Sequence, residues 1–188
     1  MMRLFVALAP PPELRATLAG MALGLPGARW VAADNLHLTL CFIGEVSPAE
    51  AEDLDGALSA LRAPAVEVRL GGIGTFGQGR RVHALWVGAA RTPALVHLQK
   101  AVERAVTRAG FTPERRKFTP HVTLARLRGA DRGRLEGFIG GHNDRPFPAF
   151  TAEAVTLYRS HLTHDGAHYE PLADYPLEGG PLESGGVA

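Results

Sequence analysis

Cysteine and long apolar runs are almost missing from this sequence of 188 residues. The one cysteine, Cys41, lies inside the apolar run 38–43, so we expect a buried strand residue in a reducing compartment rather than part of a disulfide framework. A nucleophilic cysteine is the alternative. No segment approaches the roughly 18 apolar residues of a membrane span, and the apolar stretch 4–9 is too short for a signal-peptide core. The sequence therefore predicts a soluble cytoplasmic protein with no membrane partner.

A strong charge imbalance is also missing, because 20 lysines and arginines stand against 19 aspartates and glutamates, for a formal net charge of +1. Without a whole-molecule field to hold long nucleic acid, any contact with RNA or DNA must be local. The length suits one domain, which we expect over residues 1–173, and a monomer is the simplest assembly. From 174 to 188 the chain turns to Pro, Gly, Glu and Ser without periodicity, which indicates a disordered tail.

Apolar residues recur with the period of strands in some segments and with that of helices in others. The Gly-rich stretch 71–79 contains no phosphate-loop pattern and is expected to be a hairpin loop, or else a loop at the edge of a substrate site. The order of elements in the first half of the chain loosely echoes the order in the second half. Strands are expected at residues 3–9, 36–43, 66–73, 82–87, 118–125, 150–160 and 168–172, and helices at 14–25, 48–62, 92–109 and 131–139.

The strongest echo between the halves is a His-x-Thr triplet. With eight histidines and this threonine content, about half a match is expected by chance, yet the chain has three. Two of them, at His37 and His121, stand in the apolar alternation of a strand, as His-Leu-Thr-Leu and His-Val-Thr-Leu. The third, at His161, runs into the turn signal Asp165-Gly166 and is set aside.

A strand has a period of two, so a His and the Thr two residues later project from the same face. His37 with Thr39, and His121 with Thr123, are therefore the candidate catalytic residues. Phosphodiester cleavage needs one base for the attacking water and one acid for the departing oxygen, and an imidazole near pH 7 can do either. The threonine hydroxyls can donate to the non-bridging oxygens as charge builds on them. This scheme requires no metal.

The segments around the two triplets, 35–45 (NLHLTLCFIGE) and 117–126 (KFTPHVTLAR), resemble the two signatures of the 2H phosphoesterase superfamily. More narrowly, they resemble the bacterial and archaeal RNA 2′,3′-cyclic phosphodiesterases, also called 2′-5′ RNA ligases. The similarity covers about residues 2–172. Further segments that match this branch are Arg3-Leu-Phe-Val-Ala, Arg29-Trp30, Leu85-Trp86-Val87-Gly88, and Tyr158-x-Ser160 with Gly166 and Tyr169.

This resemblance implies an α+β, bilobal fold with a pseudo-two-fold axis, in which two antiparallel sheets line a central cleft and helices lie outside. It also implies hydrolysis of RNA 2′,3′-cyclic phosphate ends to a 2′-phosphate without metal or cofactor, and a weaker, reversible 2′-5′ joining of RNA ends. The expected partners are RNA ends or small cyclic-phosphate nucleotides. By resemblance, His37 would protonate the leaving 3′ oxygen and His121 would activate water, although the residues themselves leave the two roles open.

Two further residues, each five positions after a motif histidine, are substrate-binding candidates. Arg126 matches a family arginine that helps to hold the phosphate, but it shares strand parity with the core-facing residues 122 and 124. A strand end or a bulge would bring it to the other face, and a surface salt bridge is the alternative. Phe42 is expected to be a core or cleft-wall aromatic residue, with stacking on a base as the alternative.

Two rival functions remain open. The histidines at 161, 164 and 168 have a spacing that could hold zinc on a helix, but Gly166 argues against a helix there and favours exposed loop histidines. A nucleotide-binding module that keeps the cleft but has lost turnover is the second rival. The intact His and Thr residues of both motifs argue against it.

Overall fold

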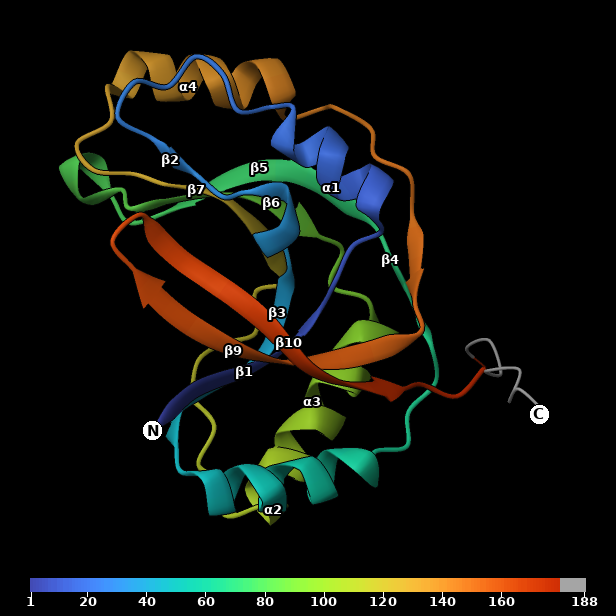
Figure 1. The fold of residues 1–188 in the computed structure, drawn as a ribbon. Helices are drawn as coiled ribbons and strands as arrows, with labels where there is room; N and C mark the ends of the chain where they lie inside the picture. Colours follow the sequence, from blue (N-terminus) through green and yellow to red (C-terminus); the bar gives the residue numbers. More distant parts are fainter. Residues whose placement is uncertain (180–188) are drawn as a thin grey trace, which may run out of the picture.

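The structure, a computed structural model, describes residues 1–179. The helices in these residues lie at the top and bottom of the view, with the sheet between them (Figure 1). They span Pro12–Ala19 (α1), Pro48–Ser59 (α2), Pro93–Arg108 (α3) and Arg132–His142 (α4). The strands span Met2–Leu8 (β1), Arg29–Trp30 (β2), Leu38–Val46 (β3), Val66–Val68 (β4), Leu70–Phe76 (β5), Ala84–Ala89 (β6), His121–Arg126 (β7), Phe150–Ala152 (β8), Ala154–Thr163 (β9) and Gly166–Pro176 (β10).

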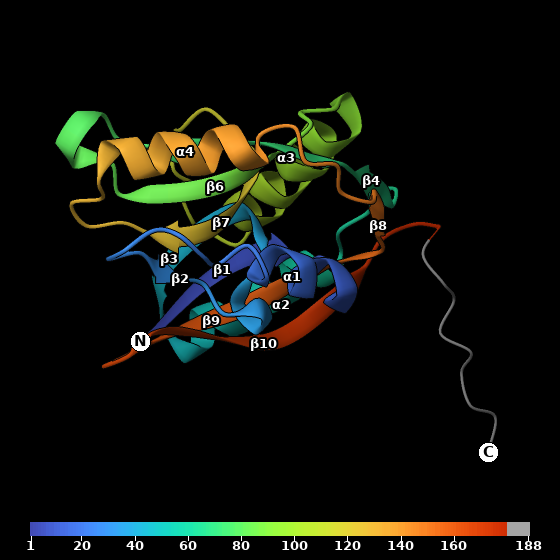
Figure 2. The same cartoon turned by 90° about the horizontal axis from the view of Figure 1, so that it is seen from above.

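Eight of the described strands form two antiparallel halves that are joined at one place, and β4 and β8 pair in a separate small sheet. One half has the order β10-β9-β1-β3 and the other has the order β7-β6-β5, with β2 paired to β7. The halves meet through the pair Leu38 and Val122, on β3 and β7. Figure 2 shows the β6–β7 half with α4 on one side and the β1–β9–β10 half with α1 on the other. The α+β class and the two-sheet arrangement expected from the sequence are thus confirmed, and hydrogen bonding links the two sheets.

Helix boundaries follow local capping and packing more closely than apolar spacing. Ser47 caps α2 in a capping box with Glu50, in the place where the sequence predicts a helix start. The helix expected over 14–25 ends at residue 19, yet Met21 and Leu25 stay buried. They reach the core from an irregular segment, so apolar spacing there indicates burial without a helix.

The Gly-rich stretch differs from the expected hairpin loop. The segment predicted as one strand over 66–73 divides into β4, which pairs with β8, and β5, which pairs with β6 and continues through Gly74 to residue 76. Glycine suits β5 because the ring of Trp86, on the neighbouring strand, lies where a side chain at position 74 would stand. The missing side chain at position 74 therefore makes room for the ring of Trp86, and this glycine does not mark a flexible loop.

The prediction of a disordered tail over residues 174–188 is wrong for the first of these residues. Strand β10 continues to Pro176, and Tyr175 is buried with its hydroxyl donating to the Asp55 carboxylate at 2.6 Å. The backbone N–H groups of Leu177 and Glu178 then donate to the carbonyl oxygens of Glu153 and Ala63, so the chain is part of the fold through residue 178. The rest of that prediction, residues 180–188, lies outside the described residues. No helix within residues 1–179 is both long and apolar enough to cross a membrane.

We predict that Gly74→Ala destabilises the protein by about 1–3 kcal/mol, because the new methyl group overlaps the ring of Trp86 and the packed sheet must shift. Gly56→Ala is the matched control: Gly56 is exposed in the middle of α2 with open space around it. There the same change should stabilise the protein by roughly 0.5–1 kcal/mol through helix propensity. Urea unfolding of both variants checks the opposite signs, and equal effects would contradict this packing.

Candidate active site

The two His-x-Thr motifs lie side by side at the place where the halves join. His37 directly precedes Leu38 and His121 directly precedes Val122, and these two apolar residues form the pair between β3 and β7. The antiparallel register through that pair places Thr39 opposite His121, and His37 opposite Thr123. The structure thus brings together all four candidate catalytic residues that the sequence predicts.

A bulge in each strand follows each motif at the equivalent position. In β7, Thr123 faces Trp86 and Ala125 faces the next residue, Leu85, so Leu124 is an extra residue. Leu124 and Ala125 are both buried, which reverses the alternation and turns Arg126 to the face of His121 and Thr123. The parity conflict at Arg126 is therefore resolved by a bulge.

The same irregularity occurs in β3. Thr39 faces Ala7 and Cys41 faces Val6, so Leu40 is the extra residue, three positions after its histidine as Leu124 is after His121. Beyond the bulge, Phe42 takes the position in β3 that Arg126 takes in β7. Phe42 contacts the small buried cluster of Phe5, Ala7 and Tyr158, and the guanidinium of Arg3 lies 5.1 Å from its ring centroid.

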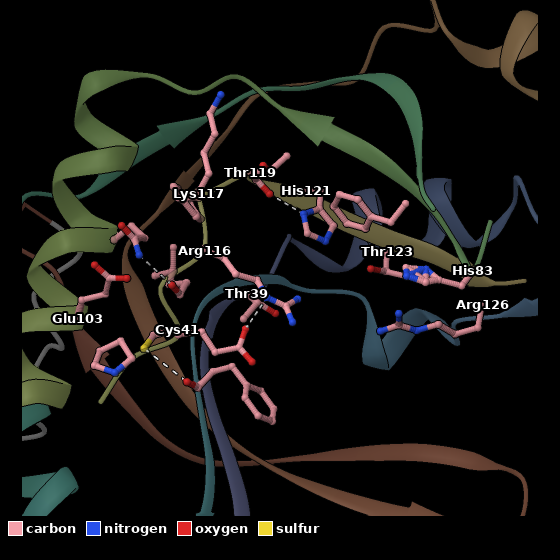
Figure 3. Close-up of a pocket in the computed structure, with 17 residues that line it drawn as sticks. Thr39, Cys41, His83, Glu103, Arg116, Lys117, Thr119, His121, Thr123 and Arg126 are labelled. Atoms are coloured by element: carbon pink, nitrogen blue, oxygen red, sulfur yellow. Dashed lines mark hydrogen bonds and ion pairs between the residues drawn. The ribbon is translucent and has the colours of Figure 1, made fainter. Parts of the chain in front are cut away.

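Two cavities meet at the motifs. The larger, about 580 Å³, is lined by Phe42 and Cys41 among others, and the smaller, about 420 Å³, is lined by His37 and Tyr169. Four residues line both: Thr39, His121, Thr123 and Arg126. Figure 3 shows Arg126 reaching toward the centre of the larger cavity from one side, with Cys41 and Glu103 at the opposite end. The shared residues therefore form a polar centre that both spaces adjoin.

Backbone hydrogen bonds fix the tautomer of both histidines. Nδ1 of His37 donates to the carbonyl oxygen of Asn35 at 2.7 Å, and Nδ1 of His121 donates to that of Thr119 at 2.6 Å. A carbonyl oxygen can only accept, so each Nδ1 carries the proton. In a neutral ring Nε2 is then the free base. Both motifs therefore hold an imidazole in the same orientation, with one nitrogen anchored and the other free to transfer a proton.

Aromatic rings hold each imidazole. Phe5 and Tyr169 lie with ring centroids 4.8 and 5.0 Å from that of His37, and Phe76 and Trp86 lie 4.8 and 5.8 Å from that of His121. The side-chain amide of Asn35 donates to the carbonyl of residue 167 at 2.7 Å, and its oxygen accepts from the backbone N–H of Tyr169 at 3.2 Å. Asn35 thus positions the imidazole of His37 through its backbone and the neighbouring tyrosine through its side chain.

Burial lowers the pKa of both histidines below the ordinary value. For His37, desolvation is the largest cause, the hydrogen bond to Asn35 opposes it, and the charges of His121 and Arg126 lower the pKa further. For His121, desolvation is again first, Thr119 opposes it, and Arg126 lowers the pKa. The site therefore favours the neutral form of both rings, which is the form that a general base needs.

Cys41 does not fit the role of a nucleophile. It is buried, and desolvation, followed by the carboxylates of Glu103 and Glu114, raises the pKa of its thiol to about 12. The thiol therefore stays protonated near neutral pH, and a thiolate is the nucleophilic form. This agrees with the first expectation, that of a buried strand residue.

The C-terminal histidines do not converge on one point. His161 pairs with Glu170 across β9 and β10 at 2.7 Å, whereas His164 is fully exposed beside Asp165 at the hairpin turn. The rings of His161 and His168 are 6.2 Å apart between centroids. Within residues 1–179, no three His, Cys, Asp or Glu side chains gather as metal ligands. The structure therefore gives no support to a zinc site on these histidines.

The sequence matches the 2′-5′ RNA ligase superfamily over residues 10–164. The chain belongs to this superfamily. It is 36% identical over 183 residues to an Escherichia coli RNA 2′,3′-cyclic phosphodiesterase, covering 93% of the chain and 96% of the relative. A Methanocaldococcus jannaschii protein of the same name is 31% identical over 177 residues, covering 93% of the chain and 100% of the relative. A third, from Geobacillus stearothermophilus, is 32% identical over 163 residues, or 84% of the chain, and the match spans 50% of that relative.

Solved structures of similar proteins have the same fold. Escherichia coli LigT complexed with 3′-AMP superposes with a TM-score of 0.75 at 31% identity, over 94% of this chain and 98% of that one. A Thermus thermophilus protein gives a TM-score of 0.78 at 27% identity, over 95% and 99% of the two chains. The family recognised from the two motifs is thus confirmed.

In this member of the 2′-5′ RNA ligase superfamily, the strand periods of the sequence did not indicate the aromatic neighbours of the two imidazoles, nor Arg29, which also lines the smaller cavity. Phe5 lies on β1, where residues on both faces are buried, so no alternation marks its face. Arg29 belongs to a strand of two residues, which is too short to show a period. Both stand in segments that match the family, and that match was the one available signal.

We predict that Arg126→Ala raises the pKa of both His37 and His121, because the guanidinium charge is one cause that lowers each of them. An NMR titration of the ring protons measures both values in one experiment. Arg134→Ala is the control, since Arg134 is an exposed arginine in the first turn of α4 and lines neither cavity. Unchanged or lowered pKa values in the Arg126 variant would contradict the placement of its charge beside the two rings.

Proposed function

We propose that this protein hydrolyses 2′,3′-cyclic phosphate ends of RNA, or small cyclic-phosphate nucleotides, to the 2′-phosphate. The observation that carries the proposal is the pair of imidazoles, each anchored at Nδ1 with Nε2 free, at the junction of two cavities. Two relatives named RNA 2′,3′-cyclic phosphodiesterase, which match over nearly their whole length, support it. The capture of 3′-AMP by a protein of the same fold supports a nucleotide as ligand.

In the proposed mechanism the cyclic phosphate binds between the two motifs. His121 takes a proton from water, the water oxygen attacks phosphorus, and the bond from phosphorus to the 3′ oxygen breaks. The anionic phosphate favours the protonated form of His37, and His37 donates its Nε2 proton to that 3′ oxygen, so the terminal 2′-phosphate and a 3′-hydroxyl remain. The hydroxyls of Thr39 and Thr123 and the guanidinium of Arg126 stabilise the charge that builds on the non-bridging oxygens. These steps balance in protons and need no metal or cofactor.

The larger cavity suits the nucleoside of the reacting end. Phe42 and Arg126 both line it, one from each half, and Arg3 covers part of the Phe42 ring. We assign Phe42 to stacking on the base and Arg126 to the phosphate. We further propose a cytoplasmic monomer. It can also join RNA ends through 2′-5′ linkages, by the same opening of the cyclic phosphate with the 5′-hydroxyl of a second RNA as the nucleophile in place of water.

We predict that His37→Ala and His121→Ala each lower the rate about 100- to 10,000-fold, the usual range for one positioned acid or base. Thr39→Ala and Thr123→Ala should each cost less, because one neutral donor is lost while the other remains. The assay follows an oligoribonucleotide ending in a 2′,3′-cyclic phosphate, in EDTA, and identifies the product phosphate. Circular dichroism confirms that each variant is folded.

His161→Ala is the matched control, since His161 also begins a His-x-Thr triplet but pairs with Glu170 far along β9. It should keep the wild-type rate. Loss of wild-type activity in EDTA would refute the metal-free mechanism, and a 3′-phosphate product would refute the leaving-group assignment. Cyclic-nucleotide binding with no turnover dependent on His37 and His121 would identify a binding module instead.

The pH dependence of kcat/KM should be bell-shaped, with both limbs below the ordinary imidazole pKa of about 6.5. The rate rises as the base loses its proton through a lowered pKa, and it falls as the acid loses its proton through another lowered pKa. Arg126→Ala should move both limbs to higher pH. Initial rates at subsaturating substrate over a pH series measure the profile, and a maximum above the ordinary value would contradict it.

A further inference from the structure

A third hollow, about 480 Å³, adjoins the proposed site and is lined by Gly27, Arg29, Arg126, Leu127 and Arg128. We call it the arginine hollow. Arg29 and Arg126 also line the smaller cavity, which His37 and His121 line as well, so the two spaces lie next to each other. Arg29 and Arg126 can therefore contact a ligand in either space.

The arginines of the hollow stand on ordered backbone. Arg29 and Arg126 are directly opposite each other on β2 and β7. The pairing continues where the N–H of Val31 donates to the carbonyl oxygen of Leu124, the bulged residue, at 2.8 Å. Trp30 packs against Phe138 of α4, with ring centroids 5.6 Å apart. The sheet therefore holds two guanidinium-bearing residues next to each other, which is unfavourable for like charges without an anion between them.

Within residues 1–179, the arginine hollow lacks a compensating negative charge. No aspartate or glutamate lines it, and none of Arg29, Arg126 and Arg128 pairs with a described carboxylate. The far end of the larger cavity differs, because its cations are balanced by carboxylates. Arg116 and Lys117 line it together with Glu103 and Glu114, and Glu114 pairs with Arg116 at 3.2 Å. Of the two ways out of the proposed site, the arginine hollow thus has the stronger attraction for a phosphate.

We propose that the arginine hollow binds the phosphate that links the cyclic-phosphate nucleotide of an RNA end to the nucleotide before it. This inference rests on the proposed function, since it takes the cyclic phosphate to lie between the two histidines. Arg128 lines neither of the two site cavities. It therefore helps to bind the RNA and takes no part in breaking the bond. The enzyme accordingly prefers an RNA end over a free nucleoside cyclic phosphate.

The test compares three substrates that share one reacting group: a nucleoside 2′,3′-cyclic phosphate, its 5′-phosphorylated form, and a dinucleotide ending in a 2′,3′-cyclic phosphate. Wild-type kcat/KM should be higher for the two that carry the second phosphate, by about tenfold, the effect of one good charged contact. Arg128→Gln should remove most of this preference through KM, while the rate on the simple nucleoside changes little. Arg29→Gln should also reduce the preference for the two substrates that carry the second phosphate.

Salt dependence separates a phosphate contact from a structural effect. In Arg128→Gln the slope of log(kcat/KM) against log salt for the dinucleotide should become shallower by about 0.7, the value for one contact to a single strand. Arg134→Gln, an exposed arginine of α4 outside these cavities, should keep the wild-type preference and slope.

Three outcomes would overturn the proposal. Wild type could show no preference for the second phosphate, or it could prefer the dinucleotide but not the 5′-phosphorylated nucleoside, which would mean contact with the second nucleoside. Arg116→Gln could abolish the preference while Arg128→Gln keeps it, which would place the chain at the other exit. If wild type hydrolyses none of the three substrates, the proposed function fails, and the arginine hollow is then tested by nucleotide binding alone.

Discussion

The pair formed by Leu38 and Val122 is the constraint on which the rest of the site depends. These residues occupy equivalent positions in two equivalent motifs, and an antiparallel pair of equivalent residues is itself a local two-fold relation. Each histidine precedes its paired residue by one, so this contact brings both imidazoles and both threonine hydroxyls to one place. Neither half of the molecule holds more than one proton-transfer group of the set by itself.

The two bulges extend this relation beyond the histidines. Each follows its motif histidine by three residues, and each turns the residue two positions further to the cleft face. There the halves differ, because one presents the aromatic ring of Phe42 and the other the charge of Arg126. A symmetric scaffold thus supports an asymmetric site, as a substrate with a base on one side of a phosphate requires. The aromatic neighbours of the imidazoles differ in the same way, with Phe5 and Tyr169 on one side and Phe76 and Trp86 on the other.

Electrostatics in the site follow from burial and from Arg126. Desolvation lowers the pKa of both imidazoles, and the nearby guanidinium of Arg126 lowers it further. A bound phosphate anion favours the protonated form of an adjacent imidazole, so in the proposed mechanism substrate binding itself helps to protonate the general acid. Net charge over the whole chain is close to balance, yet the hollow beside the site is lined by three arginines and no described acid. Local attraction for phosphate therefore does not need a basic protein.

Local pattern in the sequence determined the two His-x-Thr strands, the capped start of α2 and the family, because a strand period of two and a capping box are read from neighbouring residues. Tertiary structure alone decided the bulges that turn Phe42 and Arg126, since a bulge is defined by the partner strand. It also decided that the Gly-rich segment is a strand under Trp86 and that residues 174–178 belong to the fold, because both depend on contacts with distant residues. The proximity of Arg29 and Arg126 arises in the same way, through a pairing across almost a hundred residues that no local period records.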